Sequence, residues 1–149
     1  MAYIPTHDEG THDADLQFSS AQAIPTDGAD DISTNRIDTQ VTNPRSGEGA
    51  HPISVKIEVT TLVAVASGTS SVLEIKLYSD STGVKTIAVM TDHGAIGTLS
   101  YNQAKGTILS FPIQEYPSTD YARYLSLVLS PRSDDTLFSA GNINAWLEY

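Results

Sequence analysis

The segment Ile53-Ser54-Val55-Lys56-Ile57-Glu58-Val59-Thr60 alternates apolar and polar side chains at every position. Successive side chains of a β-strand point to opposite faces of its sheet, so the apolar residues of this segment share one face. The opposite face carries hydroxyl and charged groups that water solvates. The segment therefore predicts a strand with one face in a hydrophobic core and the other at the surface.

The same two-residue period returns along the rest of the chain. It is clear at 73–78, 109–113, 125–130 and 143–149. Less regular alternation predicts further strands at 16–24, 32–37 and 84–90, with a short piece at 96–99, which makes eight or nine strands in all. No stretch of ten residues sustains the i, i+3, i+4, i+7 apolar spacing of an amphipathic helix, so helix should be nearly absent.

Turn-forming residues separate the predicted strands. They occur at Thr26-Asp27-Gly28, Pro44-Arg45-Ser46-Gly47, Ser67-Gly68-Thr69, Ser81-Thr82-Gly83, Lys105-Gly106, Pro117-Ser118 and Ser133-Asp134-Asp135. Many short strands with turns at regular spacing are typical of β-sandwiches and barrels. We therefore expect an all-β fold.

The chain of 149 residues fits one domain, but its front third differs in composition. Residues 1–51 hold nine carboxylates and two arginines, net −7, whereas residues 52–149 hold nine carboxylates and six cations, net −3. The segment 6–15 offers no side chain suited to a core. We therefore expect residues 1–15 to form an acidic, solvated N-terminal arm or loop and residues 16–149 to form a single sandwich domain.

Composition argues against several classes of function. A formal charge of −10 without a basic patch disfavours nucleic acid as a partner. The absence of cysteine excludes disulfides, thiolate nucleophiles and cysteine-based metal sites. No apolar run approaches the length of a membrane-spanning helix, so a membrane partner is not expected. The N-terminus lacks the basic and apolar regions of a secretory signal, and we expect the protein to stay in the cell that makes it.

Two groups of residues resemble metal-binding patterns. His7 and His12 lie near carboxylates, but they belong to a segment without a rigid frame, and a solvated arm is the favoured interpretation. The segment Asp27-Gly28-Ala29-Asp30-Asp31 lacks the register of a calcium loop, and a turn with aspartates capping backbone N–H groups is favoured. His51 and His93 lie in predicted loops and receive no role. We expect neither a metal nor another cofactor.

The sequence carries no recognisable catalytic motif. No serine stands in a G-x-S-x-G context, and single scattered glycines form no phosphate-binding loop. Paired carboxylates of the glycosidase type stay open as a possibility, because the fold decides which acidic residues approach one another. An acidic-loop hydrolase is thus the least supported class, and we expect the protein not to be an enzyme.

Aromatic residues are the better candidates for partner binding. By alternation Trp146 falls opposite the apolar face of the last strand, where it is a candidate interface anchor, sugar-stacking platform or partly covered surface residue. Tyr149 ends the same strand, and Tyr3 and Ile4 precede the acidic arm without a local core. These four residues are the predicted partner-binding positions. Tyr121 and Tyr124, which flank Arg123, are expected to pack against a neighbouring loop.

Several short stretches match a known family in order and spacing. They are Met1-Ala2-Tyr3-Ile4, Ser20-Ala21-Gln22-Ala23-Ile24, Ser33-Thr34-Asn35-Arg36-Ile37-Asp38, Gly47-Glu48-Gly49-Ala50-His51-Pro52-Ile53-Ser54-Val55, Tyr124-Leu125-Ser126-Leu127 and Ala140-Gly141-Asn142-Ile143-Asn144-Ala145. With these stretches the chain resembles the small jelly-roll cement, or decoration, proteins of tailed-phage capsids. It departs from the family pattern at 5–15, an acidic insertion between the opening stretch and the first strand.

The resemblance implies both a fold and a function. The fold is an antiparallel jelly roll of about eight strands. The implied partners are the major capsid protein of the phage shell and further copies of the chain, as a homodimer or a trimer. The implied location is the outer surface of the capsid, after synthesis in the cytoplasm of the bacterial host. The family offers no catalytic residues to transfer.

One other binding function stays open. A carbohydrate- or receptor-binding sandwich with Trp146 or a tyrosine cluster as its platform is the alternative to a capsid protein. Residues Asn35, Asp38 and Glu48 of the matching stretches are expected to satisfy backbone groups in loops.

Overall fold

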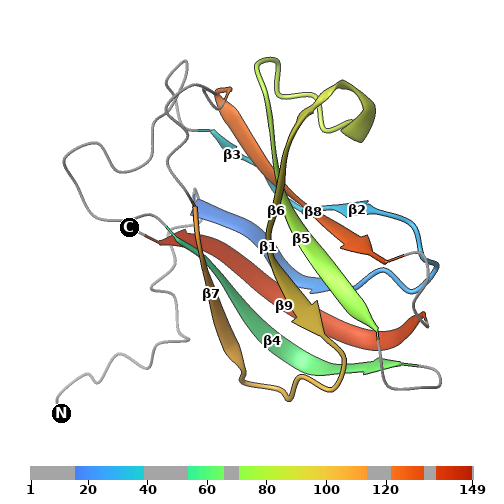
Figure 1. The fold of residues 1–149 in the computed structure, drawn as a ribbon. Helices are drawn as coiled ribbons and strands as arrows, with labels where there is room; N and C mark the ends of the chain where they lie inside the picture. The colour runs from blue at the N-terminus through green and yellow to red at the C-terminus, as the bar shows by residue number, and fades with distance from the viewer. Residues whose placement is uncertain (1–15, 39–53, 66–70, 114–121, 133–136, 149) are drawn as a thin grey trace, which may run out of the picture.

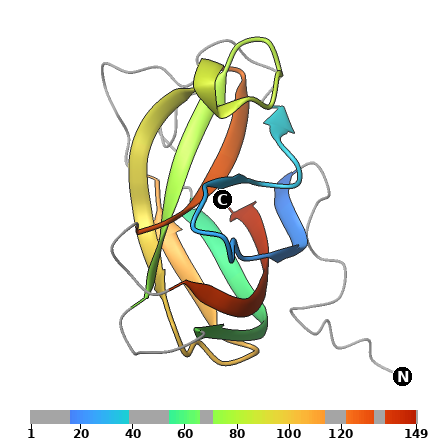
Figure 2. The ribbon, with the colours of Figure 1, turned by 90° about the vertical axis from the view of Figure 1, so that its right-hand side faces the viewer.

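The computed structural model describes residues 16–38, 54–65, 71–113, 122–132 and 137–148, which form two antiparallel β-sheets packed face to face (Figure 1). The first sheet has the strand order β1-β9-β4-β7, and the second has the order β2-β8-β5-β6 with β3 also pairing with β8. Figure 2 shows the two layers from the side, with β5, β6 and β8 on one side and β1, β4 and β9 on the other. The predicted arm, residues 1–15, lies outside the described residues.

The strands differ widely in length. Their bounds are β1 Gln17–Ala23, β2 Asp31–Ile32, β3 Ile37–Asp38, β4 Ser54–Val65, β5 Val72–Asp80, β6 Thr91–Ser100, β7 Ile108–Pro112, β8 Tyr124–Pro131 and β9 Phe138–Glu148. A single 3₁₀ turn, η2, spans Ile87–Val89 and is the one helical element of three or more residues in the described part.

The strand order is that of a jelly roll. Strands β2 and β3 both pair with β8, so they occupy one position and leave eight positions along the chain. Numbered by position, the sheets have the orders 1-8-3-6 and 2-7-4-5, in which the chain crosses repeatedly between the layers. Two Greek keys folded in this way make the jelly-roll sandwich. The expected fold class is confirmed.

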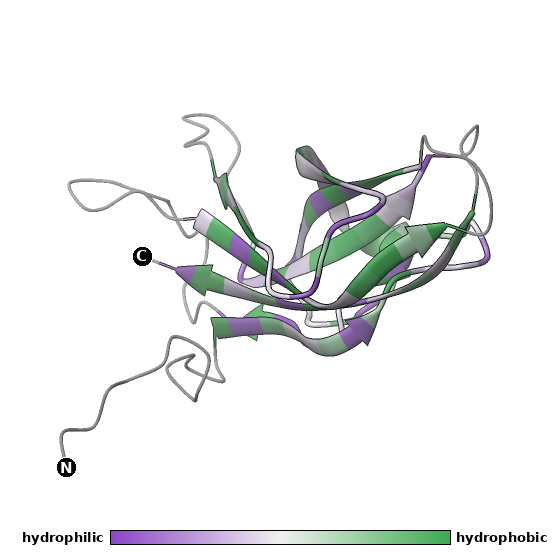
Figure 3. Cartoon of the chain, turned by 90° about the horizontal axis from the view of Figure 1, so that it is seen from below, coloured by the Kyte–Doolittle hydropathy of each residue, from purple (hydrophilic) through white to green (hydrophobic). Residues whose placement is uncertain are grey.

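The core lies between the two sheets. From β4 it takes Val55, Ile57 and Val59, all fully buried, as the alternation of that segment predicts. The second sheet contributes Leu73, Ile75 and Leu77 from β5 and Leu125, Leu127 and Leu129 from β8. Figure 3 shows the alternating hydropathy along the strands.

A second, smaller apolar cluster covers part of the outer face of the second sheet. It contains Tyr78, Met90 and Val128, with Ile32 and Ile87 packed against them. Met90 and Ile87 belong to the loop between β5 and β6, so this loop folds back over the sheet. No helix in the described residues is long and apolar enough to cross a membrane.

The strand predicted at 84–90 is wrong. The loop turns sharply at Gly83, which has φ +78°, and the Oδ1 atom of Asp80 accepts the backbone N–H groups of Thr82 and Gly83. The N–H of Val89 then donates to the carbonyl of Thr86 within the loop. These local hydrogen bonds use donors that a strand would give to a neighbour.

The strand predicted at 96–99 is longer than expected, because β6 already begins at Thr91. Its first half, Thr91-Asp92-His93-Gly94-Ala95, has no apolar alternation that could announce a strand. Among the described strands it pairs with β5 alone, as an edge strand, and its register shifts twice along that pairing. Edge strands of this kind bury few side chains and leave little periodic signal.

The strand predicted at 32–37 is interrupted between β2 and β3. At the interruption the Ser33 N–H still donates to the Leu127 carbonyl of β8, at 2.7 Å. The Asn35 N–H instead donates to the Phe18 carbonyl of β1, also at 2.7 Å. The chain therefore leaves β8 for a few residues to bind the opposite sheet and then returns.

Candidate functional site

One end of the sandwich gathers two arginines around an aromatic ring, with a lysine nearby. The guanidinium carbon of Arg36 lies 5.1 Å from the centroid of Tyr124, and that of Arg123 lies 5.2 Å from it. Both distances fall within the range of cation–π attraction. Lys85, in the loop between β5 and β6, donates from Nζ to the carbonyl of Thr34. We call Arg36, Lys85, Arg123 and Tyr124 the cationic cluster.

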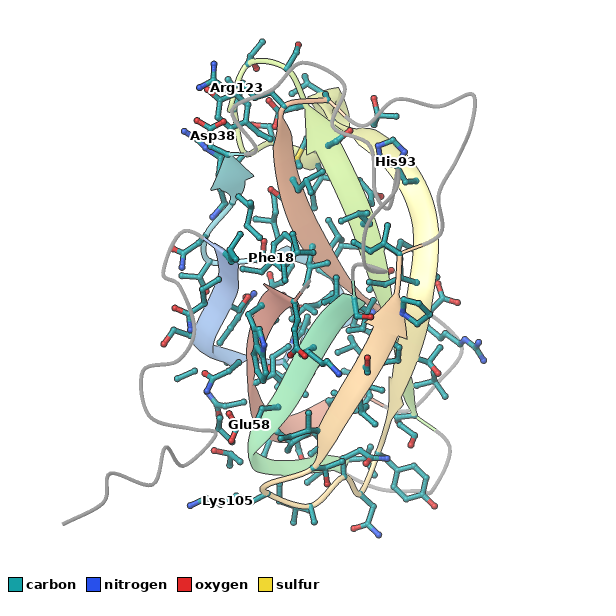
Figure 4. The ribbon with its side chains drawn as sticks, turned by 90° about the vertical axis from the view of Figure 1, so that its left-hand side faces the viewer. Phe18, Asp38, Glu58, His93, Lys105 and Arg123 are labelled. Carbon is teal, nitrogen blue, oxygen red and sulfur yellow. The ribbon has the colours of Figure 1, made fainter. Side chains whose placement is uncertain are left out.

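Strand pairing explains why these residues meet. Asp38 of β3 lies opposite Tyr124 of β8, and Asp80 of β5 lies opposite Tyr124 on its other side. Arg36 is two residues from Asp38 and Arg123 is next to Tyr124 in the chain, so both arginines lie close to this pair at one end of the second sheet. Figure 4 shows Arg123 and Asp38 together at this end and Lys105 at the opposite end of the molecule.

Arg123 is held by a two-pronged ion pair. Its Nε lies 2.7 Å from Oδ1 of Asp38, and its Nη2 lies 2.8 Å from Oδ2. The parallel bonds match the fork of a guanidinium to both oxygens of a carboxylate. The pair is partly exposed, so water screens it and its contribution to stability is small. Its main effect is to fix the position of Arg123 beside Tyr124.

The loop between β5 and β6 packs directly on the cluster. A Cβ atom placed on Gly83 would lie 3.1 Å from the guanidinium carbon of Arg36 and 3.3 Å from Cζ of Tyr124. The expected packing of Tyr124 against a neighbouring loop is thus confirmed, whereas Tyr121 lies outside the described residues. Asp80 supports the turn from below with Oδ1, and its Oδ2 is buried without a hydrogen-bond partner.

A hydroxyl–imidazole pair lies near the same end. Ser79 Oγ is 2.6 Å from His93 Nε2, and it also accepts the backbone N–H of Ala122 at 3.1 Å. Burial lowers the pKa of His93, and the nearby charge of Asp92 opposes this shift only in part. The imidazole is therefore neutral at pH 7, and its tautomer decides whether Nε2 or Oγ donates the hydrogen bond between them.

This pair has the residue types of an activated nucleophile, but its placement gives it a structural role. Ser79 is only 1% exposed, so no substrate reaches its hydroxyl in this structure. The pair instead ties β5, β6 and the start of β8 together. The interpretation of His93 as an isolated loop residue is wrong, because it lies in β6 beside a register shift that turns its ring toward Ser79.

Tyr78 makes a parallel link between the same two strands. Its hydroxyl donates to Oδ2 of Asp92 at 3.2 Å. Burial raises the pKa of Tyr78, and the charge of Asp92 and the hydrogen bond to it raise the pKa further. The phenol is therefore a neutral donor throughout the physiological range.

The predicted calcium-like segment is a turn. Oδ1 of Asp27 accepts the N–H of Ala29 at 3.0 Å, and Gly28 has φ +80°. Asp30 accepts a hydrogen bond from Ser130 of β8 at 2.7 Å. Within the described ranges no three histidine, aspartate or glutamate side chains gather closely enough to hold a metal ion. His7, His12 and His51 lie outside those ranges.

Of the four predicted partner-binding residues the structure describes Trp146 alone; Tyr3, Ile4 and Tyr149 lie outside the described part. Trp146 is absent from the core cluster that contains Ala145 and Leu147, as expected for the opposite face. Its expected exposure is wrong, because only 7% of it is accessible. The residue lies on a central strand, between Gln17 of β1 and Lys56 of β4, whose side chains project from the same face.

Sequence reasoning missed the cationic cluster. Its residues come from three separate places in the chain, and only the pairing of β3 and β5 with β8 unites them. Two signals in the sequence could have pointed to it: the adjacent pair Arg123-Tyr124, and Arg36 within the matching stretch 33–38. Comparison with known proteins adds no further assignment: no protein-family model matches the chain, and no match was found among curated proteins.

Proposed function

We propose that this chain is a structural virion protein that binds the outer surface of a tailed-phage capsid. In this role it stabilises the shell by bridging neighbouring major capsid proteins. The observation that carries the proposal is the way the matching stretches of the sequence pair with one another inside the jelly roll. Stretches far apart in the chain become neighbours, and their polar residues bind one another's backbone.

The first pairing joins the stretches 20–24 and 140–145. The N–H of Ala21 donates to Oδ1 of Asn144 at 2.7 Å, and Nδ2 of Asn142 donates to the Ala21 carbonyl at 2.9 Å. Ala21 has φ +48°, a backbone conformation that residues other than glycine rarely adopt, and the two asparagines hold its backbone there. A third bond runs from the Ile24 N–H to the Gly141 carbonyl at 2.9 Å.

The second pairing joins the stretches 33–38 and 124–127. The fully buried hydroxyl of Ser33 accepts the N–H of Leu127 at 3.1 Å and donates to the carbonyl of Asn35 at 2.7 Å. Ile37 lies opposite Leu125 in the same ladder. The matching residues therefore form two sets: one joins β1 to β9, and the other joins the β2–β3 segment to β8. This is what we expect if the resemblance reflects a shared architecture.

The physics of such a function requires no catalytic group. A protein that binds an assembled lattice and not its free subunits stabilises the lattice by RT ln(1 + [L]/Kd), about 2.7 kcal/mol at a hundredfold excess over Kd. A homodimer or trimer would engage two or three lattice points, and the resulting effective concentration slows release. A chain with a charge of −10 suits the outer surface, away from the packaged genome.

The test uses undecorated shells of the phage that encodes the chain. Purified protein should bind them saturably in a sedimentation assay and raise the temperature at which they break. Shells already saturated with unlabelled protein are the control for adventitious adsorption. Binding that does not saturate, or saturable binding without a gain in shell stability, would remove the proposal.

The carbohydrate-binding alternative loses its main residue, because an indole that is 7% exposed has no open face on which a sugar can stack.

A further inference from the structure

Arg36 is an exposed cation with unused binding capacity. Its guanidinium packs at the ring of Tyr124, and it forms no ion pair with any carboxylate in the described part of the chain. A guanidinium offers five N–H donors in a rigid fork that matches a carboxylate. Because the aromatic ring already restricts this side chain, binding an anion there costs less conformational entropy than it would for a free arginine.

The neighbouring charges leave a positive excess at this end, with Arg36, Lys85 and Arg123 against the carboxylates of Asp38 and Asp80. Arg123 keeps its positive charge close by, although Asp38 occupies its fork. Burial lowers the pKa of Lys85, and the nearby charge of Arg36 lowers it further. A carboxylate placed between Arg36 and Lys85 would relieve this repulsion. The chain as a whole is strongly acidic, so the cluster is a local exception.

The chain enters the sandwich beside this cluster. The Phe18 carbonyl of β1 accepts the N–H of Asn35, the residue before Arg36, at 2.7 Å. Residues 1–15 contain four carboxylates, Asp8, Glu9, Asp13 and Asp15, and neither lysine nor arginine. An extended chain spans up to about 3.5 Å per residue, so Asp13 and Asp15 can reach no farther than roughly 10–18 Å from Phe18.

We propose that the cationic cluster is the docking surface for the acidic N-terminal segment, residues 8–15, of the same chain. The segment and the surface have opposite charges, and the point where the segment joins the domain is next to Arg36. A short tether gives the segment an effective concentration in the millimolar range, which favours its own cluster over that of a second copy. The acidic insertion at 5–15, which departs from the family pattern, then has a binding surface within the same molecule.

The first experiment measures the mobility of residues 8–15 in the full chain by ¹⁵N heteronuclear NOE at low salt. Arg36→Gln should raise the mobility of the segment to that of a free tail. Lys105→Gln is the matched control, because it removes the same charge at the opposite end of the molecule (Figure 4) and should leave the segment restrained. Salt at 1 M, where the Debye length is about 3 Å, should release the segment in the wild type.

The second experiment measures affinity directly. The host is the full chain with Asp8→Asn, Glu9→Gln, Asp13→Asn and Asp15→Asn, which leaves the cluster open. A peptide of residues 1–15 should bind it, and Arg36→Gln should weaken binding by about fivefold, the upper value of one exposed ion pair. If Arg36→Gln fails to fold, Arg36→Lys replaces it: this variant keeps the charge but loses the fork for both carboxylate oxygens, so it should weaken binding by less than fivefold, and unchanged affinity would count against the proposal.

Three results would overturn the proposal. One is equal mobility of residues 8–15 in the wild type and in Arg36→Gln at low salt. Another is peptide affinity that does not change with Arg36. The last is a paramagnetic label on the segment of one copy that broadens the cluster signals of a second, unlabelled copy, because this would assign the segment to a neighbouring chain.

Discussion

At Gly97 one added methyl group should collide with the ring of Phe111. Gly97 lies on β6, the edge of the second sheet, and Phe111 lies on β7, the edge of the first. A Cβ atom on Gly97 would lie 2.1 Å from Cδ1 and 2.3 Å from Cε1 of the Phe111 ring. Since carbon atoms in contact are about 3.5 Å apart, the ring would have to move by roughly 1.5 Å.

The cost of Gly97→Ala has two opposing parts. Overpacking of this kind destabilises by about 1–3 kcal/mol. Loss of glycine's freedom in the unfolded chain stabilises by about 0.4–1 kcal/mol, because the backbone at Gly97 is one that alanine can adopt. The net loss is about 1–2 kcal/mol, which corresponds to a fall in Tm of about 2–8 °C for a domain of this size.

A double-mutant cycle measured by thermal unfolding tests the reasoning. In a Phe111→Ala background the obstructing ring atoms are gone, so Gly97→Ala should become neutral or stabilising. Gly94→Ala is the matched control: Gly94 has open space but φ +90°, so its cost should be the same in both backgrounds. A Gly97→Ala cost that survives the removal of Phe111 would refute the steric explanation.

Three further changes should have the following results. Ser33→Ala should lower the free energy of unfolding by about 1–3 kcal/mol in a urea titration, because it leaves the Leu127 N–H and the Asn35 carbonyl unpaired. Its control is Ser126→Ala, which removes a buried hydroxyl without a partner and should be neutral or stabilising. A larger loss of stability in Ser126→Ala than in Ser33→Ala would contradict this. His93 has a folded pKa below its unfolded value of 6.5, so its contribution to stability is present above pH 6.5 and is lost as pH falls through the folded pKa; in calorimetry between pH 7 and 5, His93→Gln should lose less stability than the wild type, and parallel pH profiles would argue against it. Tyr3→Ala combined with Ile4→Ala should weaken binding to undecorated shells without changing Tm; unchanged binding would remove both from the proposed contacts.

The core could be predicted from the sequence because burial imposes a strict pattern on it. Strands β4, β5 and β8 are flanked by partners and have one face in the core, so their side chains alternate or run apolar. The first half of β6 could not be predicted in this way. As an edge strand it owes its place to backbone pairing with β5, and backbone pairing leaves no mark on side-chain type.

Trp146 shows a different limit of periodicity. Alternation gives the face of a side chain correctly, but it does not give the exposure of that face. Exposure depends on whether the strand is central and on what covers the sheet from outside, both of which are set by topology. The strand predicted at 84–90 is wrong for a related reason: the apolar residues Val84 and Val89 are exposed, and Ile87 covers the outer cluster.

The two paired sets of matching residues also indicate where function should be sought. Asn142 and Asn144 are occupied in holding the backbone of Ala21, and Ser33 is occupied in holding β2 to β8. Residues engaged in this way have few donors or acceptors left for a partner, so binding should use side chains that these hydrogen bonds leave open, such as the guanidinium of Arg36. The loop between β5 and β6 also has side chains open to a partner. Hydrogen bonds to Asp80 hold its backbone, while Val84 is exposed beside the cationic cluster. Binding chemistry particular to this chain is therefore expected at that end of the sandwich, where none of the paired sets constrains the side chains of the loop.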